Sequence, residues 1–220
     1  MHLEILVEDE SGSILIKELM RKILEPYREH HTYRVIEYKG AGRIPKDLKG
    51  NIDPQKRILL DRLPKLLIGY GKAWQSYPHH IIVVVDQDSR DCIQFKDELV
   101  KIANQCKPKP NVFFRIAIEE IEAWLMGDEN AIIEAYPRAR KDVLRNYRQD
   151  SVCGTWEKLA DAIHTGGSAE LIKLGYPVTG RKKAEWAGRI GPNMDVNRNN
   201  SKSFQVFRDG IISLLESTHM

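Results

Sequence analysis

Apolar residues along this chain fall into short continuous runs separated by segments with helical spacing. Residues 81–85, Ile-Ile-Val-Val-Val, form an uninterrupted β-branched run, which is typical of a strand buried on both faces of a parallel sheet. Residues 3–7, 33–38 and 112–118 are also rich in strand-forming side chains. We therefore predict a strand in each of these four ranges.

The segments between these runs have the spacing of amphipathic helices. Between residues 14 and 24, apolar side chains recur three and four positions apart, which predicts a helix capped by Ser11 or Ser13. Ser89 is expected to cap a later helix. The other expected helices span 54–70, 92–105, 119–126, 155–164, 181–190 and 203–216, and a glycine-containing loop spans 39–50.

Strands and helices alternate through the first part of the chain. This order predicts an α/β fold with a doubly wound, mostly parallel sheet of four or more strands and helices on both faces. After Pro137 the pattern becomes purely helical. We predict an α/β domain at 1–137 and a helical C-terminal extension at 138–220 packed on it.

Composition and charge narrow the class of protein. With 42% hydrophobic and 30% charged residues, the chain is an ordinary globular one. Residues 1–137 carry 20 basic and 22 acidic side chains, a balance of −2, whereas residues 138–189 carry 11 and 6, a balance of +5. A basic segment after an acidic one favours metal binding beside phosphate binding, although a solvated basic helix face gives the same pattern.

Cysteine usage and hydropathy indicate the compartment. Three cysteines without a CxxC motif argue against a disulfide framework or a zinc ribbon. The longest aliphatic run, at 81–85, is too short to cross a membrane, and the first residues lack a secretory pattern. We expect a cytoplasmic protein without a membrane partner.

Acidic side chains follow three of the predicted strands. Glu8 follows the first, Asp86 and Asp88 follow the central one, and Glu120 and Glu122 follow the last. The carboxyl ends of parallel strands meet at one edge of a sheet, where ligands bind. Clustered carboxylates repel one another, and Mg²⁺ prefers oxygen ligands. The alternative is that these acids only stabilise helix N-termini.

Two longer patterns resemble a known fold and a known family. The arrangement of Glu8 and Val-Val-Val-Asp86-Gln-Asp88 resembles the Toprim fold, the Rossmann-like metal-binding domain of topoisomerases, DnaG-type primases, and nucleases of the overcoming-lysogenization-defect and RNase M5 kinds. The segments Ile-Ala-Ile-Glu-Glu120-Ile-Glu122-Ala-Trp124-Leu-Met-Gly-Asp128 and Lys183-Ala-Glu-Trp-Ala, with Asn200-Ser-Lys-Ser-Phe204, resemble an uncharacterised bacterial Toprim-like family. That resemblance implies a domain of unknown function found beside AAA-type ATPases in phage-defence or mobile loci.

The resemblance implies roles for particular residues. Glu8 would act as a metal ligand or a general acid/base, Asp86 and Asp88 would bind Mg²⁺ or Mn²⁺, and Glu120 and Glu122 are candidates for a second metal. Two such cations can activate water and stabilise the leaving oxygen of a phosphodiester.

Basic residues supply candidates for phosphate contact. Lys182 or Lys183 could neutralise charge in the transition state, and Arg43, Lys46 and Arg181 could bind a nucleic-acid backbone. The alternative is that these basic residues lie on a solvated surface and bind nothing, because such a surface has the same sequence pattern.

Three functions remain open at this point. The first is a Mg²⁺-dependent Toprim-like nuclease or other phosphodiester-transfer enzyme acting on nucleic acid. The second is a nucleotide-sugar transferase, because a strand ending in Asp-x-Asp can hold a metal-bound diphosphate, but that chemistry would not need Glu8. The third is a non-catalytic docking or regulatory partner of an AAA-type ATPase, in which the acids are structural and metal changes nothing.

Overall fold

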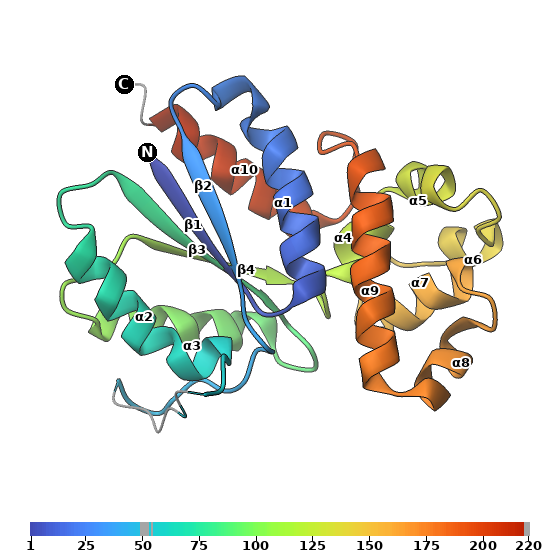
Figure 1. Cartoon of the computed structure of the whole chain (residues 1–220), viewed down its shortest axis with the longest axis horizontal. Helices are drawn as coiled ribbons and strands as arrows, with labels where there is room; N and C mark the ends of the chain where they lie inside the picture. Colours follow the sequence, from blue (N-terminus) through green and yellow to red (C-terminus); the bar gives the residue numbers. More distant parts are fainter. Residues whose placement is uncertain (49–52, 54, 218–220) are drawn as a thin grey trace.

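The core of the protein is a four-stranded, fully parallel sheet (Figure 1). The computed structural model describes residues 1–48, 53 and 55–217. The strands are β1 (His2–Val7), β2 (Thr32–Glu37), β3 (His79–Asp86) and β4 (Val112–Ala117). Their order is β2-β1-β3-β4, so β1 and β3 are central and the β-branched run of residues 81–85 is buried, as predicted.

Helices cover both faces of the sheet. Because strand side chains alternate between faces, Leu3 and Ile5 pack in one hydrophobic cluster while Leu6 packs in another. The first cluster includes α1 (Glu10–Leu24) and α10 (Lys202–Ser217), and the second includes α2 (Leu59–Ala73) and α3 (Cys92–Gln105). Figure 1 shows these two pairs of helices on opposite sides of the strands.

A group of helices stands beside the sheet, on the far side of α1 (Figure 1). The longest is α9 (Tyr176–Ile190), which packs along α1. The others are α4 (Glu122–Met126), α5 (Glu129–Ala135), α6 (Lys141–Arg145), α7 (Thr155–Ile163) and α8 (Gly167–Leu174). Short 3-10 turns, η1 (Glu25–Tyr27) and η2 (Gly191–Asn193), follow α1 and α9.

The chain returns to the sheet at its end. Helix α10 packs against β4, and its Phe204 and Phe207 stack around Trp124 of α4 at ring-centroid distances of 5.7 and 5.0 Å. The Trp124 indole N–H also donates to the Ser203 hydroxyl at 2.9 Å. The helices after residue 137 therefore complete the core of the α/β part, and the division at residue 137 stays a prediction.

The predicted α/β class is confirmed. Helices α5, α6 and α8 lie outside the helix ranges expected from the sequence, and the other differences are at helix ends. The caps are aspartates: Asp9 accepts the Gly12 N–H, and Asp91 accepts the Gln94 N–H. Ser11 instead donates its hydroxyl to Asp9. The helix expected from residue 54, which lies outside the described residues, is present from Leu59. None of the helices in the described ranges is long and apolar enough to cross a bilayer.

Candidate functional site

The carboxyl ends of β1 and β3 bring two acidic side chains together. The strands are parallel neighbours in which Val7 pairs with Val84, so the residue after β1 lies beside the last residues of β3. There Glu8 accepts a hydrogen bond from the backbone N–H of Asp86, the final residue of β3. The register of the sheet thus places Glu8 next to Asp86.

Asp88 lies in the turn after β3 and is more exposed. Its φ of 53° is in the left-handed region, which Asp adopts more readily than most residues. Its N–H donates to the Glu119 carbonyl at 2.8 Å. The Asp88 carboxylate is 57% exposed and lies 3.2 Å from Arg90, yet its charge helps to raise the pKa of Glu8. Asp88 therefore lies at the solvent-exposed rim of the site that contains Glu8 and Asp86.

Glu120 and Glu122 follow β4 and meet a lysine from α9. Lys183 Nζ donates to Glu120 Oε2 at 2.8 Å and lies 3.0 Å from Glu122 Oε2. The three side chains are 14%, 12% and 1% exposed, respectively. Asp86 is close enough to Glu8, Glu122 and Lys183 for their charges to shift its pKa. We call Glu8, Asp86, Glu120, Glu122 and Lys183 the acidic cluster.

Three carboxyl groups of this cluster, those of Glu8, Asp86 and Glu122, hold protons more tightly than exposed acids do. Burial is the main cause of the raised pKa values. Burial and the neighbouring carboxylates raise the pKa of Glu8 to about 7. Burial raises the pKa of Glu122 to about 8 even though Lys183 opposes the shift. Burial and repulsion from Glu8 and Glu122 raise the pKa of Asp86 well above its usual value. Glu8 and Glu122 are therefore poised to exchange protons near neutral pH.

One ammonium group cannot balance the acidic cluster. Burial alone would lower the pKa of Lys183, but Glu122, Glu120 and Asp86 raise it well above its ordinary value, so this lysine is charged. If all four carboxyl groups were ionised, four carboxylates and one ammonium would give −4 + 1 = −3. This excess negative charge in a buried place is unfavourable without a further proton or cation.

The donor set suits a hard divalent cation. All the acids offer oxygen ligands, as Mg²⁺ requires, and Glu122 Oε2 is buried without a hydrogen bond despite its ion pair with Lys183. Among the described residues, no three or more His, Cys, Asp or Glu side chains already stand in a metal-binding arrangement. Glu8 faces a backbone N–H and Glu120 faces Lys183, so a cation would draw these carboxylates away from their present partners.

The other predicted basic residues lie outside the acidic cluster. Lys182 points to Glu185 at 2.7 Å, and its neighbour Arg181 is exposed on α9. Arg43 and Lys46 are exposed in the loop after β2. That loop starts at the same sheet edge, because the Gly40 N–H donates to the Glu8 carbonyl at 2.7 Å. Only Lys183, of the two candidate lysines, enters the acidic cluster.

Glu119 has a structural role that the sequence did not reveal. Its carboxylate accepts the backbone N–H groups of Cys153, Gly154 and Thr155 at 2.8 to 3.1 Å, together with the Thr155 hydroxyl. Burial would raise the pKa of Glu119, but these hydrogen bonds, the Thr155 side chain first, lower it. Glu119 therefore fixes the start of α7 to the end of β4. No local motif links residues 34 to 36 positions apart.

Two cavities border the acidic cluster, and we call them together the groove. Cavities of about 240 and 340 Å³ both include Glu120 and Trp156 in their walls. The Trp156 backbone N–H donates to Glu120 Oε1 at 2.7 Å. The first cavity extends to Asp88, and the second extends to Lys183 and Tyr176, whose ring is 75% exposed. Aromatic side chains thus stand beside the carboxylates, where they can contact a planar group of a ligand.

Comparisons with known proteins give one family and one distant structure. The model of a family described as "Domain of unknown function (DUF4276)" matches residues 7–212. The solved C-terminal region of the OLD protein from Xanthomonas campestris pv. campestris is similar over 99% of this chain and 97% of that chain, with 13% sequence identity and a TM-score of 0.42. No curated protein matches the sequence.

Proposed function

This chain belongs to the family of unknown function DUF4276, and we propose that it is a Mg²⁺-dependent, Toprim-like enzyme that cleaves or transfers phosphodiester bonds in nucleic acid. One observation carries the proposal: a buried excess of carboxylates stands at the carboxyl edge of a parallel sheet, the edge where such folds bind ligands. Asp86 and Glu122 are at its centre, and Lys183 is its one close ammonium among the described residues.

The metal would be held by oxygen ligands from three strand ends. Glu8, Asp86 and Glu122 are the central candidates, with Asp88 at the rim and Glu120 within reach of Lys183. When bound, Mg²⁺ would lower the pKa of a coordinated water and polarise a phosphoryl oxygen. A second cation, shared by Glu120 and Glu122, belongs to the same proposal.

Residues of the chain would supply proton transfer and charge stabilisation. If Asp86 and Glu122 hold the metal without Glu8, the Glu8 carboxyl group, whose pKa is raised to about 7, would accept or return a proton near neutral pH. Lys183, which is now paired with Glu120 and Glu122, would be free to neutralise negative charge on a phosphoryl group if those carboxylates held a cation.

The surface around the acidic cluster has groups that suit a nucleic-acid substrate. Arg43, Lys46, Arg181 and Lys182 would contact backbone phosphates from the β2–α2 loop and from α9. Trp156 and Tyr176, which line the groove beside Glu120, would contact bases. In this proposal residues 1–137 supply the metal ligands and residues 138–220 add Lys183 and the aromatic wall.

Cleavage assays with paired variants test this function. The protein should cut single- or double-stranded DNA or RNA in millimolar Mg²⁺ or Mn²⁺ and be inactive in EDTA. Asp86→Asn should abolish cutting, whereas Asp97→Asn, on the exposed face of α3, should leave it unchanged. A wild-type protein that cuts none of these substrates, alone or with a co-encoded AAA-type ATPase, would refute the proposal.

A second candidate, a non-catalytic docking module for an AAA-type ATPase, is favoured by one observation. Lys183 already pairs with Glu120 and Glu122 in the acidic cluster, which is how a purely structural ion-pair network would look. This candidate predicts that millimolar Mg²⁺ leaves the melting temperature unchanged and that the protein still binds the ATPase after Asp86→Asn.

A further inference from the structure

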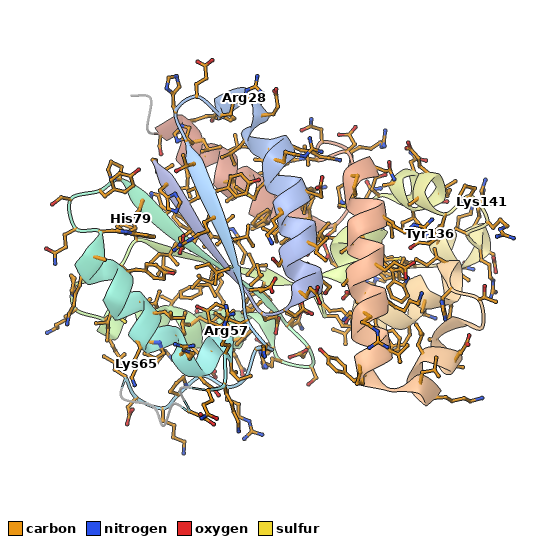
Figure 2. All side chains as sticks on the ribbon, in the orientation of Figure 1. Arg28, Arg57, Lys65, His79, Tyr136 and Lys141 are labelled. Atoms are coloured by element: carbon orange, nitrogen blue, oxygen red, sulfur yellow. The ribbon has the colours of Figure 1, made fainter. Side chains whose placement is uncertain are left out.

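A second cavity lies in the helical part of the molecule, away from the acidic cluster. Its volume is about 440 Å³, and it is surrounded by residues of α5, α7 and α9, by the connection between α5 and α6, and by the residues that follow α7. Figure 2 labels Tyr136, one of its wall residues, beyond α9 from the sheet. Its volume is in the range of about 300–1,000 Å³ that is usual for small-molecule sites.

The wall of this cavity is strongly cationic. Three arginines, Arg138, Arg140 and Arg189, and His164 line it, and Asp161 is the one acidic side chain in the wall. Asp161 is engaged elsewhere, because its Oδ1 accepts the backbone N–H of Ser168 at 2.7 Å. We call this set of residues the arginine cavity.

The guanidinium groups are held in different ways. Arg189 lies over the Tyr136 ring at 4.3 Å, donates to the Ala135 carbonyl at 3.2 Å and forms an ion pair with Glu185 Oε1 at 3.6 Å, so its position is fixed. Arg140 reaches only the exposed Asp142, at 3.3 Å. Arg138 is exposed, and in the described part of the chain no hydrogen bond or ion pair holds its side chain. One arginine is therefore preorganised and two can turn toward a ligand.

Two polar atoms in the wall are shielded from solvent without a hydrogen-bond partner. These are the Tyr136 hydroxyl oxygen and His164 Nε2, as found among the described residues. Glu170 lies 3.5 Å from His164 Nε2, without forming a hydrogen bond. Buried polar atoms are normally satisfied. A ligand with several acceptor oxygens would satisfy both groups, since Tyr136 can donate its proton and His164 can donate from a ring nitrogen.

We propose that the arginine cavity binds a phosphate group, carried either by a nucleic-acid backbone or by a free nucleotide. Guanidinium groups form paired hydrogen bonds to phosphate oxygens and stay charged at all relevant pH values. Three of them around one cavity, with a tyrosine hydroxyl and an imidazole, form a donor-rich surface that matches a tetrahedral oxyanion. The three arginines all belong to the basic segment at 138–189, so this site would account for part of its positive charge.

The same helices connect this site to the acidic cluster. Trp156 and His164 are eight residues apart across α7 and its C-cap, and Lys183 and Arg189 are six residues apart on α9. At 1.5 Å per residue these separations are roughly 12 and 9 Å. The two sites therefore share two helices, and phosphate binding at the arginine cavity does not depend on the proposed cleavage.

Binding titrations in EDTA test this inference separately from catalysis. The probes are a fluorescein-labelled single-stranded DNA 12-mer and inorganic pyrophosphate. The double variant R138Q/R140Q should bind at least one probe about tenfold or more weakly, and the dependence of oligonucleotide binding on salt should become shallower. Arg145→Gln, an exposed arginine on α6 outside the cavity wall, is the matched control and should bind like the wild type.

The two probes distinguish the sources of the phosphate. Loss of oligonucleotide binding alone assigns the cavity to a nucleic-acid backbone, and loss of pyrophosphate binding assigns it to a free phosphate ligand. If R138Q/R140Q fails to fold, Arg138→Gln replaces it, because that side chain is exposed. Wild-type binding of both probes by the variant, no binding of either probe by the wild type, or an equal loss in Arg145→Gln would overturn the inference, whether or not the protein cleaves nucleic acid.

Discussion

Replacing Glu119 tests the anchor that joins the end of β4 to the start of α7. Its carboxylate accepts three backbone N–H groups and one hydroxyl. Losing an N-cap acceptor costs about 0.5–2 kcal/mol, and a buried donor left without a partner costs about 1–3 kcal/mol. The N–H group of Cys153 is exposed and those of Gly154 and Thr155 are only partly buried, so water would replace some of these bonds. We therefore expect Glu119→Ala to lose about 2–3 kcal/mol.

Urea unfolding at pH 7 measures this loss directly. At about 2–4 °C per kcal/mol for a chain of this size, the melting temperature should fall by about 4–12 °C. Glu134→Ala, an exposed acid on α5, is the control and should change stability by less than about 0.5 kcal/mol. Glu119 has a φ of 61°, so Glu119→Gly removes backbone strain as well as the carboxylate and should be less destabilised than Glu119→Ala.

A double-mutant cycle between Glu119 and Thr155 distinguishes the loss of this hydrogen-bonded anchor from a general packing defect. Thr155→Val removes the hydroxyl that donates to Glu119, and the double variant should lose less than the sum of the two single losses. A loss below about 0.5 kcal/mol in Glu119→Ala, or strict additivity with Thr155→Val, would show that the contact does not anchor α7.

Two further predictions concern buried charges. Glu4 is fully buried and bonded to Arg34 and Tyr70; burial would raise its pKa, but these hydrogen bonds lower it below 4.5. Its stabilising contribution is therefore complete above pH 4.5 and lost as the pH falls through the lowered value, so urea unfolding from pH 7 to 3 should show a smaller acid loss in Glu4→Gln than in the wild type, and equal slopes would contradict this. Lys183→Met should lose about 2–4 kcal/mol in EDTA and recover more stability on adding Mg²⁺ than the wild type does, whereas Lys182→Met should change little; thermal melts with equal losses for both would refute the assigned difference.

The strands of the sheet were predictable because each is marked by a short run of residues within its own segment of the sequence. A β-branched run such as 81–85 predicts a buried parallel strand by itself, and the parallel order then places the residues after each strand at one edge. This reasoning extends to Glu8 and Asp86, which follow neighbouring strands and are in contact. It also explains why Asp88, two residues further, is already in an exposed turn.

Interactions between distant segments were not predictable from spacing. Lys183 and Lys182 are adjacent in the sequence, but the packing of α9 along α1 turns only Lys183 into the acidic cluster. The caps show a similar limit. Ser11 and Asp9 are both good caps, and the chain uses Asp9 because the helix starts at Glu10.

A crystal structure of the protein soaked in Mn²⁺ tests the central claim most directly. The account predicts an anomalous peak bound by Asp86 together with Glu8 or Glu122, at an oxygen distance of about 2.0–2.3 Å, and a shift of Lys183 away from Glu122. The same soak of Asp86→Asn should show no peak there. An acidic cluster without metal in the wild type, with Lys183 still paired to Glu120 and Glu122, would contradict a metal-dependent function at this site.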